Sequence, residues 1–231
     1  MRIMEFNNTF RYHSTLNPVA WSDLDLKPEV RLALLRIARN FINYLNLPQL
    51  DVRDIVLVGS NANYNWNSYS DFDVHVIASY DSINCDADEA LFKAKKDLWN
   101  NAHDITIHGF DVELYVQDVN ERLESKGQFS LLNNEWLSEP RHEPPKIDDM
   151  AVTKKTKSMM HHIDQVVDHE PSVESIERIQ DKIKRMRRSG LAERGEFSIE
   201  NLVFKNLRNA GYLDRLSKTK TQLTDNELSL Q

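Results

Sequence analysis

The chain has 231 residues, of which 40% are hydrophobic and 28% are charged, a composition that excludes fibrous and wholly disordered classes and indicates a globular protein. The formal net charge of −7 argues against nonspecific coating of nucleic acid by the whole surface, although a local basic patch stays compatible with it. The single cysteine, Cys85, excludes an internal disulfide and a cysteine-rich zinc site, and the lack of any run of about 18 apolar residues predicts a cytoplasmic protein without a membrane span.

The first predicted elements are an amphipathic helix and a buried strand. From Pro28 to Leu45 apolar residues recur at helical spacing, and proline is well tolerated at the first helical position. Pro48 closes that segment. The β-branched run from Asp54 to Val58 follows and ends at Gly59, a pattern typical of a buried strand.

The next predicted strand carries acids on one face. Residues Asp71 to Val76 alternate strictly, so that Asp71, Asp73 and His75 point one way while the apolar residues between them point the other way. A helix from Ala87 to Ala102 is then expected to return the chain across the sheet.

Two more strands follow this helix. The runs Ile105 to Ile107 and Phe110 to Val116 predict strands joined by a tight turn at His108 and Gly109, because glycine readily adopts positive φ. The second of them alternates again, with its polar residues on one face: Asp111, Glu113, Tyr115 and Gln117. Acids therefore reach a sheet surface at a second place.

Strand signals end beyond this point. The mixed aromatic segment from Gln128 to Trp136 and the prolines at 140, 144 and 145 are interpreted as a connector. Three helices are then predicted, with breaks at Pro171 and Gly190: Met150 to His169, Val173 to Ser189 and Ser198 to Leu216. The polar tail from Ser217 to Gln231 is predicted to be frayed or disordered.

Together these elements predict an α/β fold. A short mixed sheet with flanking helices forms a domain over residues 1–148, and residues 149–231 form an α-helical C-terminal domain. We expect the active site to lie between the two. The sequence does not indicate an oligomeric state.

The acids of the first acidic strand suit a metal site. Asp71 and Asp73 lie two residues apart on one strand face, so their side chains are close and repel each other unless a cation is bound. Magnesium prefers a few carboxylates together with phosphate oxygens and water. On its own the spacing is weak evidence, because solvated strands often carry alternating charges.

Two further features strengthen this interpretation. Gly59 and Ser60 follow an apolar strand, where the glycine lets backbone amides approach a phosphate and the serine hydroxyl adds a hydrogen bond. A third acid on a neighbouring strand, either Glu113 or Asp111, would complete the metal coordination and accept the proton of an attacking hydroxyl. The three elements together are much more specific than any one of them.

This arrangement resembles the signature of the polymerase-beta-like nucleotidyltransferases. The resemblance implies that Gly59 and Ser60 contact a triphosphate. It also implies that Asp71 and Asp73 bind both metal ions, and that Glu113, which lies between two apolar residues, binds the catalytic one.

A closer resemblance, over roughly the first 140 residues, is to predicted nucleotidyltransferases of tailed bacteriophages, which implies a location in the host cell cytoplasm. It rests on four segments: Thr15 to Pro18, Leu26 to Arg31, Gly59 to Tyr64 and Glu113 to Gln117. The chain departs from the family pattern at Glu113, where aspartate is commoner, and at Tyr64, where many relatives carry glycine. Tyr64 would narrow the approach to the phosphate or stack on a base.

Other residues have structural interpretations that compete with functional ones. His75 shares the acidic face, but we interpret it as a hydrogen-bonded structural imidazole. We interpret His161, His162 and His169 as surface histidines, because no cysteine or carboxylate pattern supports zinc. Trp66 and Tyr64 either stack on a base or pack in a turn.

The segment from Arg178 to Arg194 is strongly basic, with seven basic residues against two acids. Such a run is usually a solvated helix face. It could also hold a triphosphate or an RNA acceptor opposite the acidic site.

The predicted reaction is the attack of an acceptor hydroxyl on the α-phosphate of a nucleoside triphosphate such as ATP, with release of pyrophosphate by a two-metal mechanism. The predicted metal is Mg²⁺, with Mn²⁺ as a substitute, held by Asp71, Asp73 and Glu113. An RNA or other nucleic-acid end is the favoured acceptor. Two alternatives stay open: nucleotidylation of a protein side chain, as in minimal toxin–antitoxin relatives, and a catalytically inactive nucleotide-binding relative.

Overall fold

The structure is a computed structural model that describes residues 9–82, 88–123, 125–169 and 171–229. The chain divides into two compact units, which are residues 11–143 and, among those described, residues 9 and 10 with 144–229. The domain boundary expected after residue 148 stays a prediction. Cys85 lies outside the described residues.

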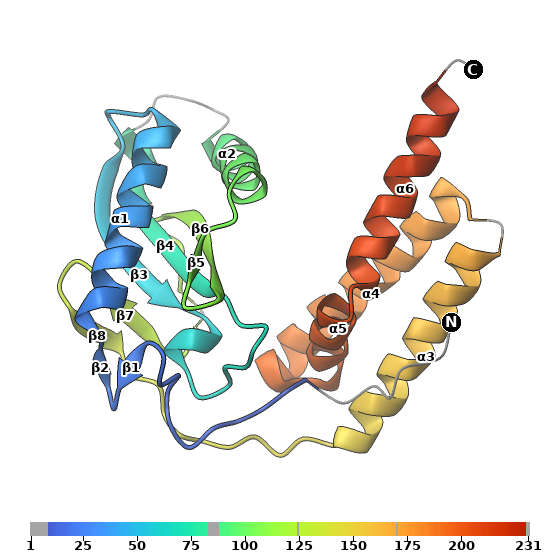
Figure 1. The fold of residues 1–231 in the computed structure, drawn as a ribbon, viewed down its shortest axis with the longest axis horizontal. Coiled ribbons are helices and arrows are strands. Elements are labelled where there is room, and N and C mark those ends of the chain that lie inside the picture. Colours follow the sequence, from blue (N-terminus) through green and yellow to red (C-terminus); the bar gives the residue numbers. More distant parts are fainter. Residues whose placement is uncertain (1–8, 83–87, 124, 170, 230–231) are drawn as a thin grey trace. The chain divides into compact units, whose positions relative to one another are not determined.

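The larger unit is built on a six-stranded mixed sheet in the order β5-β6-β4-β3-β7-β8 (Figure 1). Its strands are β3 (Asp51–Val58), β4 (Phe72–Ser79), β5 (Thr106–Ile107), β6 (Phe110–Asp118), β7 (Gln128–Ser130) and β8 (Glu135–Ser138). Strands β4 and β6 are parallel, and their crossover contains helix α2 (Asp88–Ala102), as parallel neighbours require. The predicted mixed sheet with flanking helices is confirmed.

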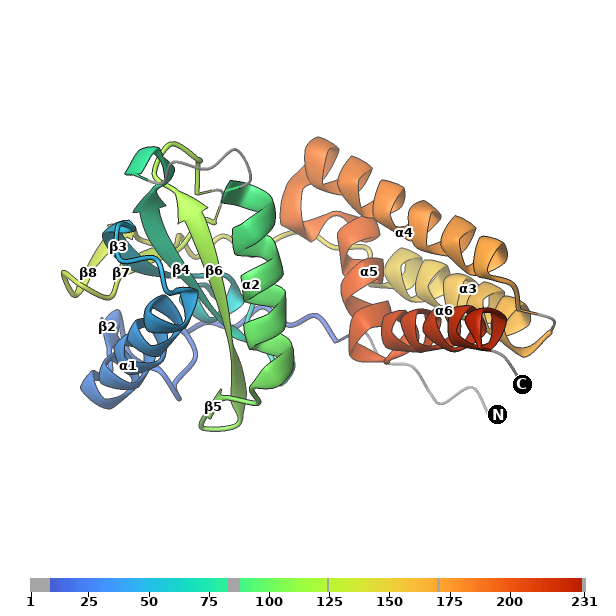
Figure 2. The same cartoon turned by 90° about the horizontal axis from the view of Figure 1, so that it is seen from above.

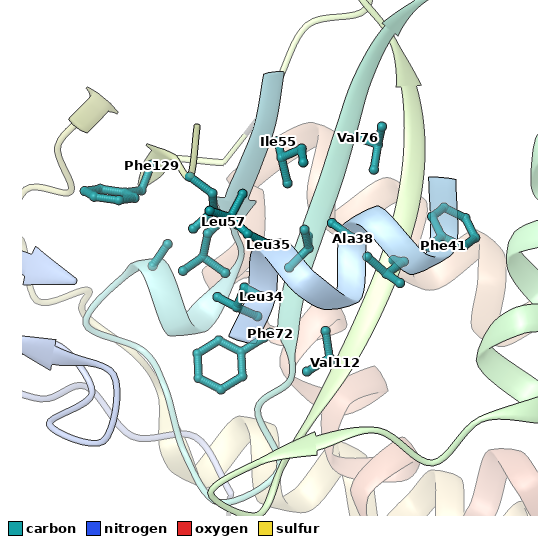
Figure 3. Packing of buried hydrophobic residues seen from close by; sticks show 14 of the residues in the cluster. Leu34, Leu35, Ala38, Phe41, Ile55, Leu57, Phe72, Val76, Val112 and Phe129 are labelled. Carbon is teal, nitrogen blue, oxygen red and sulfur yellow. The ribbon is translucent and has the colours of Figure 1, made fainter. Parts of the chain in front are cut away.

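Helix α1 (Pro28–Leu45) has the bounds predicted from its apolar spacing, and it ends where Asn46 adopts a left-handed conformation with φ 53°. Its apolar face packs on one face of the sheet, where Figure 3 shows Leu34 beside Phe72. Phe41 and Phe72 are completely buried. The sheet therefore has one apolar face under α1, which leaves the polar residues of β4 and β6 on the opposite face.

Helix α2 runs beside β6 (Figure 2). On the side of β6 away from β4, strand β5 pairs only with the first two residues of β6. The backbone groups of the later residues of β6 need other partners on that side. Asn100 of α2 supplies one, because its side chain donates to the Leu114 carbonyl and accepts from the Leu114 amide, both at 3.4 Å. Phe92 and Trp99 anchor the helix in the core.

The turn between β5 and β6 forms as predicted, with φ 50° at His108 and 84° at Gly109. The connector expected after the sheet is partly wrong, because β7 and β8 extend the sheet there. Strand β7 pairs with β3 through Val56 and Leu57. A second small sheet joins β1 (Trp21–Ser22) to β2 (Asp25–Leu26), and three-residue 3₁₀ helices η1 (Ser60–Ala62) and η2 (Tyr80–Ser82) follow β3 and β4.

The two ends of the larger unit meet. The Nε2 atom of His142 lies 3.1 Å from the His13 carbonyl oxygen, and the amide of Glu143 donates to the Tyr12 hydroxyl at 3.0 Å. The rings of Tyr12 and His142 lie 5.4 Å apart. The chain thus enters and leaves this unit at one place.

The second unit is helical, with α3 (Asp149–Asp168), α4 (Val173–Arg194), η3 (Gly195–Phe197), α5 (Ile199–Asn209) and α6 (Tyr212–Leu228). Three predictions are wrong here. Helix α4 continues through Gly190, the predicted third helix divides at Ala210 and Gly211, and the tail expected to be frayed is helical to Leu228. Within the described residues, the helices are too short or too polar to cross a membrane.

Gly190 lies within α4 at a close contact with the start of α5. A Cβ atom there would lie 2.5 Å from Cβ of Glu200 and 2.7 Å from Oγ of Ser198. Glycine therefore serves the close packing of two helices. Thr9, the first described residue, joins the same unit, since its amide and hydroxyl both donate to the Asn206 side chain.

Candidate functional site

Three carboxylates converge on the polar face of the sheet. In the parallel register of β4 and β6, Asp73 lies directly opposite Glu113, and Asp71 immediately precedes β4. One carboxylate oxygen from each of the three lies within 4.8 Å of the others. The structure thus brings together the three residues that the sequence analysis selected as metal ligands.

The donor set fits a hard divalent cation. Asp71 and Asp73 are partly buried, whereas Glu113 is exposed, so the group is open to solvent on one side. Three carboxylates at this separation repel one another when ionised, and an oxygen-coordinated cation relieves that repulsion. Magnesium takes few protein carboxylates and keeps positions for water and phosphate, which such an open group allows.

Asp111 does not join this group. It is exposed and pairs with Thr106 of β5, near the hairpin turn. Strand alternation alone could not separate it from Glu113, because both point to the same face. The register that sets Glu113 opposite Asp73 distinguishes the two positions geometrically.

Gly59 lies against the carboxylate of Asp73. Its backbone has φ 76° and ψ −159°, a conformation that is essentially restricted to glycine. A Cβ atom at this position would lie 1.9 Å from Oδ2 of Asp73. Backbone conformation and space therefore both require glycine here, and the amide of Gly59 donates to the Ser125 hydroxyl at 3.2 Å.

The Ser60 hydroxyl lies in a small network of polar groups. It donates to Oγ of Ser70 at 2.8 Å, and that oxygen also accepts from the Asn67 amide at 2.9 Å. Ser70 keeps the Asn67 bond if the Ser60 hydroxyl rotates toward another acceptor. Ser60 can therefore donate to a ligand without leaving Ser70 unbonded.

A buried asparagine pair positions the segment that carries Asp71. Asn61 donates to the Asp71 carbonyl at 2.9 Å and accepts from the Asn17 side chain at 2.8 Å, while its own carbonyl accepts from the Trp21 indole at 2.7 Å. Asn17 and Asn61 are completely buried. Sequence reasoning assigned neither a role, although both lie within segments that carry the family resemblance.

Tyr64 packs within the protein. Its ring lies 4.9 Å from that of His142 and 6.2 Å from that of Tyr12. Trp66 stacks on His13 at 3.8 Å, and its indole donates to the Thr15 carbonyl at 3.0 Å. These contacts favour the turn-packing interpretation of both aromatic residues over base stacking.

His75 is hydrogen-bonded, as its structural interpretation requires. Its Nδ1 atom lies 2.7 Å from Oε1 of Gln117, and its ring lies 5.1 Å from that of Tyr115. Burial is the main cause that lowers the pKa of His75, and the nearby positive charge of Lys96 lowers it further, against the hydrogen bond to Gln117. Both causes favour the neutral imidazole.

The remaining candidates lie in the helical unit. His161 and His162 lie in α3 and His169 follows it; within the described part of the chain, the group of potential metal ligands contains none of the three. The basic segment lies in α4, where Arg178 pairs with Glu174 and the Arg187 guanidinium lies 4.1 Å above the Phe204 ring. Those two cations already have partners.

Comparison with known proteins gives little guidance. No family model and no curated protein matches the chain. Among solved structures, the STING-associated CdnE c-di-GMP synthase from Capnocytophaga granulosa is 12% identical, with 90% of this chain and 89% of that chain covered at a TM-score of 0.23. A TM-score this low does not establish a common fold.

Proposed function

We propose that the chain is a metal-dependent nucleotidyltransferase that transfers a nucleoside monophosphate from a nucleoside triphosphate to an acceptor hydroxyl. The observation that carries this proposal is the convergence of Asp71, Asp73 and Glu113 beside a glycine with no room for a side chain. Clustered carboxylates suit a divalent cation, and a bare backbone beside them suits a phosphate. Phosphoryl transfer requires both together.

Each residue of the group has a role in this reaction. Asp71, Asp73 and Glu113 would hold Mg²⁺ or Mn²⁺, which when bound neutralises phosphate charge and favours ionisation of the attacking hydroxyl. Glu113, the most exposed of the three, accepts the hydroxyl proton. The acceptor oxygen bonds to the α-phosphorus, the bond from that phosphorus to the bridging oxygen breaks, and pyrophosphate leaves.

The segment after β3 would hold the leaving phosphates. Gly59 lets the backbone lie against them, and the Ser60 hydroxyl turns from Ser70 to donate to a phosphate oxygen. The buried Asn61 fixes this segment to the backbone of Asp71. The segment of the proposed phosphate contacts is therefore tied to the segment that carries Asp71.

An RNA or other nucleic-acid end is the proposed acceptor, supported by the excess of basic residues in α4. The resemblance to bacteriophage enzymes and the cytoplasmic location stay predictions from the sequence.

Thermal unfolding of the wild-type protein with Mg²⁺ and each nucleoside triphosphate tests the proposal. We expect stabilisation by one triphosphate that depends on Mg²⁺ and is lost in Asp73→Asn. Asp111→Asn is the matched control, because it removes a carboxylate from the same sheet face outside the group of three. Radiolabelled triphosphate, incubated with separate RNA and protein pools, then identifies the acceptor class. A well-folded protein that no triphosphate stabilises would refute the proposal.

A further inference from the structure

The polar face of the sheet continues beyond the carboxylates as a second row of side chains. His75 lies directly opposite Tyr115 in the parallel register, two residues after the pair formed by Asp73 and Glu113. Two residues of strand span about 6.6 Å. The rings of His75 and Tyr115, 5.1 Å apart, thus form a platform beside the acidic group.

A lysine from α2 lies over this platform. The Lys96 Nζ atom is 5.5 Å from the centre of the Tyr115 ring, and the lysine side chain is only 26% exposed. Its ion pair is with the adjacent residue Asp97, at 3.4 Å, and that carboxylate is 53% exposed. Such a solvated pair contributes little energy, so the ammonium can exchange Asp97 for a stronger anionic partner.

The platform and the Gly59 segment lie on opposite sides of the carboxylates. Strand β3 is antiparallel to β4, with Val58 opposite Asp73 and Val56 opposite His75. Gly59 therefore continues away from the row that contains His75. In phosphoryl transfer the attacking and leaving oxygens lie roughly in line across the phosphorus. If the leaving phosphates occupy the Gly59 side, the acceptor approaches from the side of Lys96 and Tyr115.

We propose that Lys96 and Tyr115 form an acceptor subsite that holds a backbone phosphate and a ring of a single-stranded nucleic acid beside Glu113. This inference rests on the proposed function and adds where the acceptor binds. A lysine ammonium is a phosphate-binding point charge, and an aromatic ring stacks on bases or packs against a sugar. A neutral protein hydroxyl would need neither group, so their combination favours a nucleic-acid end.

The test compares Lys96→Met with Lys93→Met, which removes the same charge from an exposed position of α2. The probe is a short fluorescein-labelled single-stranded RNA, with a DNA of the same sequence as a second arm, and binding is followed by anisotropy with Mg²⁺ and a non-hydrolysable triphosphate analogue. We expect Lys96→Met to weaken RNA binding by about tenfold and to reduce the salt slope by about one, as for one lost phosphate contact. Lys96→Arg should retain both.

The triphosphate provides the internal control. Thermal stabilisation by Mg²⁺ and triphosphate should be the same in Lys96→Met and the wild type, which also shows that the variant is folded. Three results would overturn the inference: triphosphate binding that weakens instead of RNA binding, no difference between Lys96→Met and Lys93→Met, or a wild-type protein that binds neither oligonucleotide. In the last case, stabilisation by triphosphate would leave the proposed function standing.

Discussion

Replacing Gly59 by alanine should disable the site through one methyl group. The added Cβ would lie 1.9 Å from Oδ2 and 2.8 Å from Cγ of Asp73, so the carboxylate must leave its present position beside Asp71 and Glu113. The backbone conformation adds about 1–3 kcal/mol of strain for any residue other than glycine. We expect Gly59→Ala to lose at least this much stability and, in addition, the stabilisation by Mg²⁺ and triphosphate.

The helical unit offers a matched control for the strain. Gly195 has φ 72° and ψ −159°, almost the same as Gly59, but its added Cβ would meet nothing within 4 Å. Gly195→Ala should therefore cost the same backbone strain and keep the response to metal and triphosphate. The difference between the two variants reports the displacement of Asp73.

Two measurements on each variant separate the effects. Chemical denaturation gives the change in the free energy of unfolding, and thermal shift gives the stabilisation by ligand, which is about 2.7 kcal/mol at a hundredfold excess over Kd. If Mg²⁺ and triphosphate stabilised Gly59→Ala as much as they stabilise the wild type, the reasoning would be refuted. Ligand binding would then not depend on the position of the Asp73 carboxylate against Gly59.

Three further outcomes follow from the structure. Glu113→Gln should slow single-turnover transfer by at least about 100-fold with little change in triphosphate binding. Asp111→Asn should slow transfer much less. If Asp111→Asn slowed transfer more than Glu113→Gln did, the catalytic role would move to Asp111. Gly190→Ala should destabilise the helical unit in chemical denaturation, because the new Cβ would meet Glu200 at 2.5 Å. The same change within an ordinary helix stabilises by about 1 kcal/mol. A gain in stability would therefore contradict the close helix packing. The hydrogen bond from Lys155, at 2.6 Å, lowers the pKa of Glu200 against the effect of burial. The wild type should therefore be more stable than Glu200→Gln by about 0.5–1 kcal/mol at neutral pH. This difference in the free energy of unfolding should disappear as the pH falls below 4.5, the ordinary pKa of a glutamate, and through the lowered pKa of the folded state. Urea titrations across that pH range measure it.

The parts of the fold that local patterns determine could be predicted. Alternation placed Asp73 and Glu113 on the polar faces of their strands, and helical spacing gave the bounds of α1. Glycine chemistry located the turn at Gly109. In each case the residues that decide the structure are neighbours in the sequence.

Long-range packing determined the parts that could not be predicted. Gly190 has the sequence pattern of a helix end, but its lack of a side chain serves contact with Glu200 of another helix. Strand β7 is short, and its pairing with Val56 and Leu57 spans more than seventy residues. The choice of Glu113 over Asp111 depends in the same way on the register between β4 and β6.

The candidate site shows the same division. Gly59, Asp71 and Asp73 belong to one short motif, whereas the Asn17 side chain reaches Asn61 across 44 residues. Polar pairs of this kind have no periodicity, so no pattern in the sequence identifies them before the fold is known.

The meeting of His13 with His142, and of Tyr12 with Glu143, closes the sheet unit at one junction. The described residues on either side of this junction, Thr9 and Phe10 before it and those after residue 143, belong to the helical unit. Because the two ends of the sheet unit touch, this unit brings the flanking parts of the chain together as a short loop would. The entropy of closing such a loop depends only weakly on its number of residues. The entropy of chain closure in the helical unit therefore depends little on the length of what lies between residues 10 and 144.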